Sequence, residues 1–359
     1  MGTTLLYESY KRVSVASLHG YEKKPGLTDK EQLNMLVDHQ GRVIDYLRVS
    51  ITDLCNLRCI YCRPPEGVPL VSHKDILRYE EILRLIRIAR DLGIRKLRIT
   101  GGEPLIRRGV LSFIERLTQL EGIEDIGLTT NGVLLESMAA DLRLSGLTRI
   151  NISLDTIRKE IFASITGRDY LQNVLRGIEA SLKAGLSPVK INVVLLEGFN
   201  EADVAGFARM TIDRPLEVRF IERMPFGDGS MPNAPLSFSA YTVLGMIRSQ
   251  VGELEPLERA ALDGPATMFR LRGALGKIGV IDPVTGHFCG SCNRLRLTAR
   301  GTLRPCLLSP QEIDIKAALR AGASDQQLAT FFYDAVLKKP VGKIQSADAL
   351  KDTMNMIGG

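Results

Sequence analysis

The chain has 359 residues, of which 45% are hydrophobic, and its 47 Lys and Arg against 41 Asp and Glu give a formal net charge of +6. One large core with a smaller appended region is expected, because single cores stop growing near roughly 250–300 residues. The absence of Trp and of basic runs interleaved with aromatic residues disfavours a nucleic-acid partner, and the lack of a long apolar run or a targeting peptide predicts a cytoplasmic protein without a membrane anchor.

The N-terminal residues 1–42 have weak periodicity and many polar residues, which predicts a partly flexible extension. After them, β-branched apolar runs alternate with helical patterns. Six strands are expected, at Leu47–Ile51, Lys96–Thr100, Asp125–Thr129, Thr148–Leu154, Val189–Leu195 and Leu216–Ile221. The helical patterns between them lie at Tyr79–Leu92, Val110–Leu120, Leu171–Ala184 and Glu201–Met210.

Strands that alternate with helices imply parallel pairing and right-handed crossovers. Six such units predict an α/β fold with a partial, TIM-like (β/α)6 barrel over residues 43–226. The pattern then breaks into Gly- and Pro-rich sequence at Gly227–Pro235. We expect residues 227–359 to form a smaller C-terminal region of short strands, with helices near Ser239–Ser249, Gln311–Leu319 and Gln326–Leu337.

All six cysteines fall into two groups of three, called here the first triad (Cys55, Cys59 and Cys62) and the second triad (Cys289, Cys292 and Cys306). Scattered core cysteines would not cluster in this way. Disulfides would leave one thiol over in each triad unless the two triads were cross-linked. For a chain expected in the cytoplasm, ligation of a metal or a cluster is favoured.

The first triad, Cys55-x3-Cys59-x2-Cys62, follows the first expected strand directly. Three thiolates on a short loop can hold three irons of a four-iron cluster and leave the fourth iron open to another ligand. A zinc site would need a fourth Cys or His, and His73 is the one histidine near this loop. A zinc site and three coincidental core thiols are the alternatives.

Polar or glycine-rich segments follow the other expected strands. In a barrel the active site is built from such carboxyl ends. Glycines let the backbone approach a ligand closely, and a glutamate can hold an ammonium group. The segments are Gly101-Gly102-Glu103-Pro104, Thr129-Thr130-Asn131-Gly132, Ser153-Leu154-Asp155 and Glu222-Arg223-Met224-Pro225.

The cysteine loop, with Tyr61 before its last cysteine and Gly-Gly-Glu-Pro after the second strand, resembles the radical S-adenosylmethionine (SAM) superfamily. Further segments narrow the resemblance to the GTP 3′,8-cyclase family, which acts in the first step of molybdenum cofactor biosynthesis. They are Ile99–Pro104, Leu128–Gly132, Ile150–Asp155, Phe220–Phe226 and Phe288–Thr298. The resemblance covers roughly residues 43–359 and implies the radical SAM type of partial barrel, with a second cluster in the C-terminal region.

The resemblance implies two [4Fe–4S] clusters and SAM as cofactors. The first triad would bind the cluster that cleaves SAM, and the second triad a cluster whose open iron meets the guanine of GTP. SAM would be lined by Tyr61, Gly102, Glu103, Ser153 and Met224. GTP would be contacted by Arg48, Arg98, Thr129, Lys190, Arg294 and Arg296. Arg294, Arg296 and the terminal Gly358 and Gly359 are expected to support catalysis.

The sequence has no Gly-x4-Gly-Lys-Ser/Thr loop, so a triphosphate would be held by separate cationic side chains. The implied activity is that of a lyase-class cyclase. A radical formed from SAM removes hydrogen from C3′ of GTP, and C3′ closes onto C8 to give 3′,8-cyclo-7,8-dihydroguanosine triphosphate.

The resemblance also implies a flavodoxin- or ferredoxin-type electron donor, a homodimer, and transfer of the product to cyclic pyranopterin monophosphate synthase. Two alternatives remain. One is another radical SAM enzyme with an auxiliary cluster, such as a peptide-modifying enzyme, although Arg294 and Arg296 beside the second triad suit a nucleotide better. The other is a non-catalytic zinc or iron–sulfur module.

Overall fold

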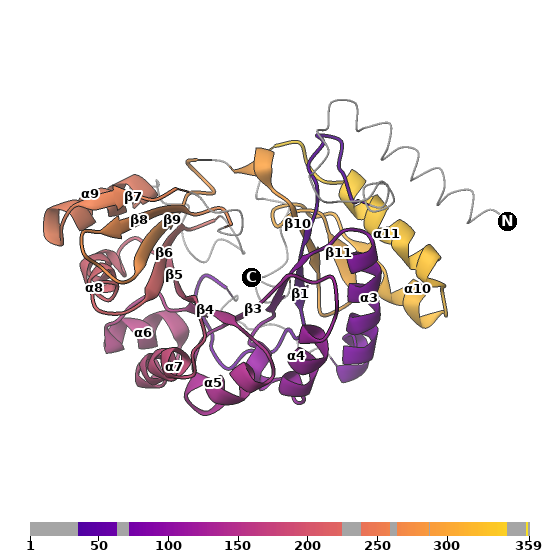
Figure 1. Cartoon of the computed structure of the whole chain (residues 1–359), viewed down its shortest axis with the longest axis horizontal. Helices are drawn as coiled ribbons and strands as arrows, with labels where there is room; N and C mark the ends of the chain where they lie inside the picture. The colour runs from indigo at the N-terminus through magenta and orange to yellow at the C-terminus, as the bar shows by residue number, and fades with distance from the viewer. Residues whose placement is uncertain are drawn as a thin grey trace. The chain divides into compact units, whose positions relative to one another are not determined.

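A computed structural model describes residues 35–62, 72–224, 238–258, 264–286, 288–342 and Ile357. The contacts divide the chain into two compact units. The first unit comprises the described residues within Met1–Cys55, Pro69–Ile126 and Cys289–Gly359, and the second those within Asn56–Val68 and Gly127–Phe288. The first unit therefore combines early and late segments of the described part of the chain (Figure 1). The expected division between residues 226 and 227 stays a prediction.

The first unit contains the strands in the order β12-β11-β10-β1-β2. Strand β10 is parallel to β1 and β1 to β2, whereas β11 and β12 are antiparallel to their neighbours. The strands are β1 (Tyr46–Ser50), β2 (Lys96–Thr100), β10 (Arg294–Leu297), β11 (Thr302–Arg304) and β12 (Ile313–Asp314). The helices are α3 (Tyr79–Asp91), α4 (Val110–Thr118), α10 (Lys316–Arg320) and α11 (Asp325–Leu337), with short 3-10 turns η1 (His73–Asp75), η2 (Pro104–Ile106) and η4 (Cys289–Ser291).

The core of the first unit follows from the alternation of side chains along its parallel strands. The apolar residues on one face are buried almost completely: Leu47, Val49, Leu97, Ile99, Leu295 and Leu297. The residues between them are mostly basic and lie on the opposite face. Helix α3 buries an apolar stripe that includes Ile82, Leu85 and Ile86, and Tyr79 stacks on Phe113 of α4 with ring centroids 4.4 Å apart.

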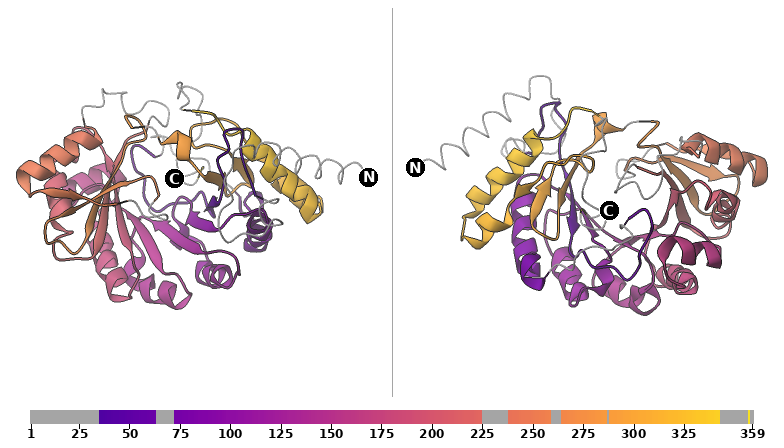
Figure 2. Two further views of the ribbon diagram at one scale, coloured as in Figure 1. Left: turned by 45° about the horizontal axis from the view of Figure 1, so that its top comes forward. Right: turned by 180° about the vertical axis from the view of Figure 1, so that it is seen from behind.

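The second unit contains the strands in the order β3-β4-β5-β6-β9-β8-β7. Strands β3 to β6 are parallel, β9 is parallel to β6, and β8 and β7 are antiparallel. Figures 1 and 2 show helices along one side of β3 to β6. The strands are β3 (Asp125–Thr130), β4 (Arg149–Ser153), β5 (Val189–Leu195), β6 (Leu216–Glu222), β7 (Leu254–Pro256), β8 (Thr267–Leu271) and β9 (Lys277–Ile281). The helices are α5 (Leu135–Leu144), α6 (Lys159–Thr166), α7 (Leu171–Lys183), α8 (Val204–Arg209) and α9 (Ala240–Gln250), with η3 (Glu201–Asp203) before α8.

The α/β fold and all six expected strands are confirmed, and each strand lies within one residue of its expected bounds. Helices α5 and α6 are additional to the helical patterns that the sequence indicates. The expectation of a helix over Gln311–Leu319 is wrong in its first half. Ile313 pairs with Leu303 in the β11–β12 ladder, and α10 begins only at Lys316. Sheet pairing therefore outweighs the helical pattern there.

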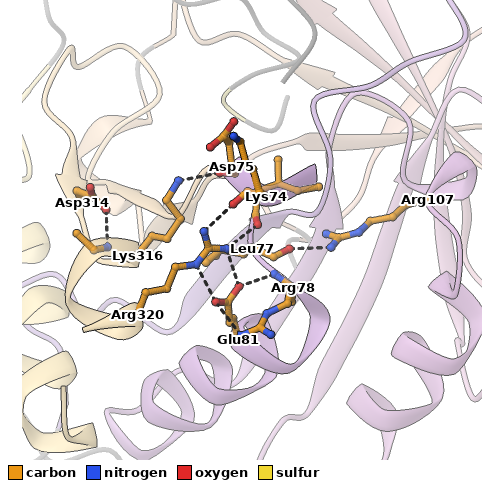
Figure 3. Close-up of polar contacts among 11 residues, drawn as sticks. Lys74, Asp75, Leu77, Arg78, Glu81, Arg107, Asp314, Lys316 and Arg320 are labelled. Carbon is orange, nitrogen blue, oxygen red and sulfur yellow. Dashed lines mark hydrogen bonds and ion pairs between the residues drawn. The ribbon is translucent and has the colours of Figure 1, made fainter. Parts of the chain in front are cut away.

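Helix α10 anchors the segment before α3 (Figure 3). Arg320 donates to the carbonyls of Lys74 and Ile76 at 2.6 and 3.0 Å, and its Nε donates to Oε1 of Glu81 at 2.9 Å. Partial burial opposes ionisation of Glu81, but the hydrogen bonds from Arg320 and from the backbone of Arg78 lower its pKa to about 2. The ion pair thus stays formed at neutral pH and fixes the start of α3.

A second cation extends this anchor (Figure 3). Arg107 donates to the carbonyl of Leu77 at 2.7 Å and also to the carbonyl of Ile51. Its guanidinium lies over the ring of Tyr79, 4.1 Å from the centroid. Because Ile51 begins the segment that leads to the first triad, Arg107 connects that segment to the start of α3.

Candidate active site

The chain that leads into the first triad is docked on the Gly-Gly-Glu turn after β2. The N–H of Gly102 donates to the carbonyl of Thr52, and the N–H of Glu103 donates to the carbonyl of Leu54, both at 2.7 Å. A Cβ at Gly102 would stand 2.3 Å from the oxygen of Leu54. This close approach of two backbones requires glycine and positions the residue before Cys55.

We expect Gly102→Ala to weaken SAM binding and first-cluster occupancy, because the new methyl group meets a backbone oxygen that cannot move alone. Overpacking of this kind costs about 1–3 kcal/mol. Iron analysis and equilibrium dialysis with SAM measure the effect. The matched control is Gly245→Ala in α9, where an added Cβ meets nothing within 4 Å. Equal iron content and SAM affinity in the two variants would contradict the prediction.

Cys59 and Cys62 lie in the part of the loop that belongs to the second unit, where it is tied to the end of α6. The N–H groups of Arg58 and Ile60 donate to the carbonyls of Thr166 and Ile165 at 2.8 and 3.0 Å. The N–H of Cys62 donates to the carbonyl of Cys59 at 3.0 Å, which closes a turn between the two ligands. Helix α6, which the sequence pattern did not reveal, thus positions two thiols of the first triad.

The side chain of Tyr61 is fixed by a buried carboxylate in the same unit. Its hydroxyl donates to Oδ2 of Asp155 at 2.7 Å, and Oδ1 of Asp155 accepts from the N–H of Val194 at 2.9 Å. Burial raises the pKa of Asp155 to about 6. Burial and the charge of Asp155 raise the pKa of Tyr61, so the phenol stays protonated and keeps donating. Asp155 lies two residues beyond Ser153, which ends β4.

Glu103, Ser153 and Met224 lie at the ends of strands, as the sequence indicated. Glu103 is fully buried, and its Oε1 accepts from the N–H of Leu105 at 2.9 Å, which caps η2. Ser153 and Met224 are half-buried. Cys55, Gly102 and Glu103 belong to the first unit, and Tyr61, Ser153 and Met224 to the second.

The second triad lies wholly within the first unit. Cys289 begins η4, Cys292 precedes β10 and Cys306 follows β11. Burial raises the pKa of Cys289, and the charges of Cys306 and Cys292 raise it further, as expected of three thiols close together. Burial also tends to raise the pKa of Cys292, but the charges of Arg294 and Lys339 outweigh it and lower that pKa overall. This triad therefore has cations beside it that favour a thiolate.

Cationic side chains form a continuous group on the strands beside the second triad, called here the basic face. Arg48 is in register with Arg296 on β10 and with Arg98 on β2, so three arginines lie in one row across three parallel strands. In the neighbouring row Tyr46 lies between Arg294 and Lys96. The basic face thus comprises Arg48, Lys96, Arg98, Arg294 and Arg296 around the phenol of Tyr46.

The pKa values of groups on the basic face indicate a strong positive electrostatic potential there. Burial alone would raise the pKa of Tyr46, but the charges of Arg98 and Arg48 lower it to about 6. The pKa of Arg296 is lowered well below its usual value by burial and then by the charges of Arg48 and Arg294. Cations that repel one another in a buried place favour an anionic ligand. The basic face is suited to a polyanion such as a triphosphate.

The second unit carries a smaller group of charges around Lys190. Thr129, Asn151 and Lys190 lie in one row across β3, β4 and β5. Lys190 Nζ lies 2.9 Å from Oε2 of Glu217, which also accepts from Nη2 of Arg219 at 2.8 Å. Burial and the charge of Arg219 lower the pKa of Lys190 to about 8. Thr129 and Lys190 are thus in register, as two of the expected GTP residues.

The sequence pattern did not single out Tyr46 and Lys96, which share a strand face with the expected residues Arg48 and Arg98. The signal was present, because Tyr46 lies two residues from Arg48 and Lys96 two residues from Arg98, and residues two apart on a strand share a face. Gly358 and Gly359 lie outside the described residues, so their expected role stays a prediction.

The donors of each triad are suited to a cluster. Within the described ranges, no three His, Cys, Asp or Glu side chains are placed to hold a single metal ion. A cluster has a different requirement, because each thiolate binds a different iron and the sulfurs stand further apart. Three cysteines in each triad match the ligand number of a four-iron cluster with one open iron. No helix in the described part of the chain is long and apolar enough to cross a membrane.

Comparisons with known proteins agree with this geometry. Residues 49–211 match the Radical SAM superfamily, and residues 216–343 match Molybdenum Cofactor Synthesis C. A GTP 3′,8-cyclase of Heliobacterium modesticaldum is 50% identical over 311 residues, which cover 85% of this chain and 93% of the relative. A GTP 3′,8-cyclase of Moorella thermoacetica is 48% identical over 322 residues, covering 89% and 98% of the two chains.

Among solved structures, Streptococcus suis SuiB bound to precursor peptide SuiA is similar with a TM-score of 0.56. The match covers 97% of this chain and 88% of that chain at 13% identity. An identity this low shows a shared fold and carries no information on the substrate.

Proposed function

Because this chain belongs to the GTP 3′,8-cyclase family of radical SAM enzymes, we propose that its two cysteine triads have separate tasks, one toward SAM and one toward GTP. As a member of this family it is an enzyme of molybdenum cofactor biosynthesis that uses SAM and [4Fe–4S] clusters and cyclises GTP between C3′ and C8. The assignment of individual residues to these tasks is the proposal.

The first triad is proposed to hold the cluster at which SAM binds. When bound, that cluster supplies the electron that cleaves SAM. Within the first unit, the backbone of Gly102 allows close approach and Glu103 lies buried at the same turn. Within the second unit, the hydrogen bond to Asp155 fixes Tyr61. Ser153 and Met224 complete the proposed SAM contacts from the ends of β4 and β6.

The second triad and the basic face are proposed to bind GTP, the guanine at the open iron and the triphosphate on the arginines. The observation that carries this assignment is the row of Arg98, Arg48 and Arg296 in the same unit as Cys289, Cys292 and Cys306. A peptide would not require such a concentration of buried positive charge. Thr129 and Lys190 are proposed as further GTP contacts from the second unit.

Anaerobic incubation of the iron-reconstituted chain with SAM, GTP and a reductant tests the proposal directly. We expect 5′-deoxyadenosine and a cyclised nucleotide to form together. The nucleotide should be absent when GTP is replaced by a peptide or when SAM is withheld. Formation of 5′-deoxyadenosine without any change in GTP would favour a different substrate and would contradict the assignment of the basic face.

Replacing Arg294 with Ala should weaken GTP binding roughly ten- to a hundredfold, because a charge-assisted hydrogen bond is worth about 1.5–3 kcal/mol. SAM affinity should change little. Calorimetry with each ligand makes the measurement. Arg272→Ala is the matched control, because Arg272 is 83% exposed and pairs with Glu255 on the surface. If Arg294→Ala and Arg272→Ala bound GTP with equal affinity, Arg294 would not contact GTP.

Raising the pH through about 8 should weaken GTP binding through Lys190, because that is where its ammonium loses its proton in the free protein. If bound triphosphate keeps Lys190 charged, affinity should fall about tenfold between pH 7 and pH 9 through this residue alone. Lys190→Arg stays charged over this range and should lack this component, while changes in the ionisation of GTP affect both proteins equally. If GTP affinity depended on pH in the same way in the unchanged protein and in Lys190→Arg, Lys190 would not contact GTP.

The remaining proposals rest on the family resemblance. They are a flavodoxin- or ferredoxin-type electron donor, a homodimer, transfer of the product to cyclic pyranopterin monophosphate synthase, a cytoplasmic location, and support of the radical chemistry by Gly358 and Gly359. Sedimentation of the reconstituted chain tests the dimer. Product formation by a chain extended beyond Gly359 tests the tail, since a native rate would assign the terminal glycines no role.

A further inference from the structure

Lys339 is a buried cation that neither the sequence pattern nor the proposed reaction uses. It lies just after α11, is 6% exposed, and belongs to the same unit as the second triad. Its Nζ donates to the carbonyls of Arg294 and Pro305 at 2.7 and 2.9 Å and stands 3.6 Å from Sγ of Cys292. One ammonium group therefore contacts one ligand of the triad and two of its backbone supports.

The carbonyl acceptors of Lys339 are placed so that they fix two segments of the triad. Arg294 begins β10 just beyond Cys292, and Pro305 immediately precedes Cys306. The third segment is held by Arg42, whose Nη1 donates to the carbonyl of Cys289 at 2.6 Å and whose Nη2 donates to the carbonyl of Pro340 at 2.8 Å. Through residues 339 and 340, the end of α11 is connected to all three ligand segments.

The two cations differ in how their charge is balanced. Nε of Arg42 lies 2.6 Å from Oδ2 of the buried Asp38, so this guanidinium has a carboxylate partner. The contacts found for Lys339 among the described residues are two neutral carbonyls and a thiol, with no carboxylate. A buried charge is costly unless it is compensated. The negative charge that compensates Lys339 would come from the thiolates of the second triad and from the cluster that they would bind.

We propose that Lys339 is a positioning residue of the second cluster, which holds the ligand segments in place and raises the reduction potential of the cluster through its charge. This inference rests on the proposed function, in which the second triad binds a [4Fe–4S] cluster. The physical reason is that a nearby cation and hydrogen bonds to cluster sulfurs favour the more negative, reduced state. Since Lys339 also fixes the backbone of Arg294, it links the cluster to the basic face.

The test measures the second cluster by itself in the full-length chain. Cys55, Cys59 and Cys62 are all replaced by Ser, so that iron can bind only at the second triad. The protein is reconstituted anaerobically, and the fraction of reduced cluster is followed by electron paramagnetic resonance during a redox titration. Four variants are compared in this background: Lys339→Met, Lys339→Gln, Lys339→Arg and, as a matched control, Lys338→Met. Lys338 is the exposed neighbour of Lys339.

In Lys339→Met and Lys339→Gln we expect the ratio of reduced to oxidised cluster at a fixed potential to fall about tenfold, which is about 59 mV for one electron. Gln keeps a hydrogen-bond donor without the charge, so its shift isolates the electrostatic part. Lys339→Arg should keep most of the parent potential, and Lys338→Met should keep all of it. A residue that served only the fold would not shift a potential in this pattern.

The outcomes separate the two levels of inference. If the triple Ser parent binds no iron, the proposed second cluster fails, and the proposed role of Lys339 fails with it. If the parent binds a cluster but Lys339→Gln titrates at the parent potential, the role of Lys339 is overturned. Loss of the cluster from both Met and Gln variants supports the proposal when the unfolding midpoint is unchanged, and overturns it when the midpoint falls, since Lys339 would then serve the fold alone.

Discussion

The Cys59→Ala variant should form no 5′-deoxyadenosine from SAM. Only two thiolates of the first triad would remain, and these cannot hold three irons of a cluster while leaving the fourth open. The loop itself should stay in place, because the backbones of Arg58 and Ile60 on either side donate to the end of α6. The loss should therefore be one of ligation and not of folding.

Iron analysis, the electron paramagnetic resonance spectrum and chromatography of 5′-deoxyadenosine check this prediction together. The second triad provides an internal control, because about half of the iron should remain if each triad holds one four-iron cluster. If Cys59→Ala still cleaved SAM, the first triad would not be needed for that cleavage.

Cys292→Ala should have the complementary effect, sparing some cleavage of SAM while abolishing the turnover of GTP. Cys292 is the ligand that Lys339 contacts, and it lies two residues before the first residue of β10, which carries Arg294 and Arg296. Its removal should therefore affect the place where the guanine and triphosphate are expected. Cys59 and Cys62 belong to the other unit and should keep their backbone supports.

The measurement is a parallel assay of 5′-deoxyadenosine and cyclised nucleotide, with the spectrum of the first cluster as the control. Uncoupled cleavage, with 5′-deoxyadenosine but no nucleotide product, is the expected pattern. Loss of both activities to the same extent, with a normal first-cluster spectrum, would contradict a division of tasks between the triads.

The six expected strands, β1 to β6, could be predicted closely because each is a short apolar run with clear ends, and β1 and β2 alternate apolar with basic or polar residues. Helix α6 was missed because its pattern covers only eight residues, and α5 because its apolar stripe is weak. The pairing of β10 with β1 joins opposite ends of the chain, and no local pattern can reveal it.

The site shows the same division between local and long-range information. Each triad and the Gly-Gly-Glu turn lies within one short stretch of sequence, so the resemblance could identify them. Arg42 and Lys339 could not be recognised, because their partners are backbone carbonyls that only the fold brings near. In sequence, Lys339 lies in a Lys-Lys-Pro run that is typical of a solvated helix end.

The pairing of β1 with β10 also has a consequence for how the protein is made. The ribosome releases β1 well before β10, so until β10 emerges one edge of β1 lacks the neighbour it has in the folded protein. Domains generally fold during translation as their residues emerge, and unpaired strand edges are prone to aggregation. The strands of the second unit, β3 to β9, can pair with one another before β10, β11 and β12 of the first unit have emerged. The cysteines of the second triad therefore emerge and reach their folded positions later than the loop of the first triad, so we expect the second cluster site to be the later of the two to form.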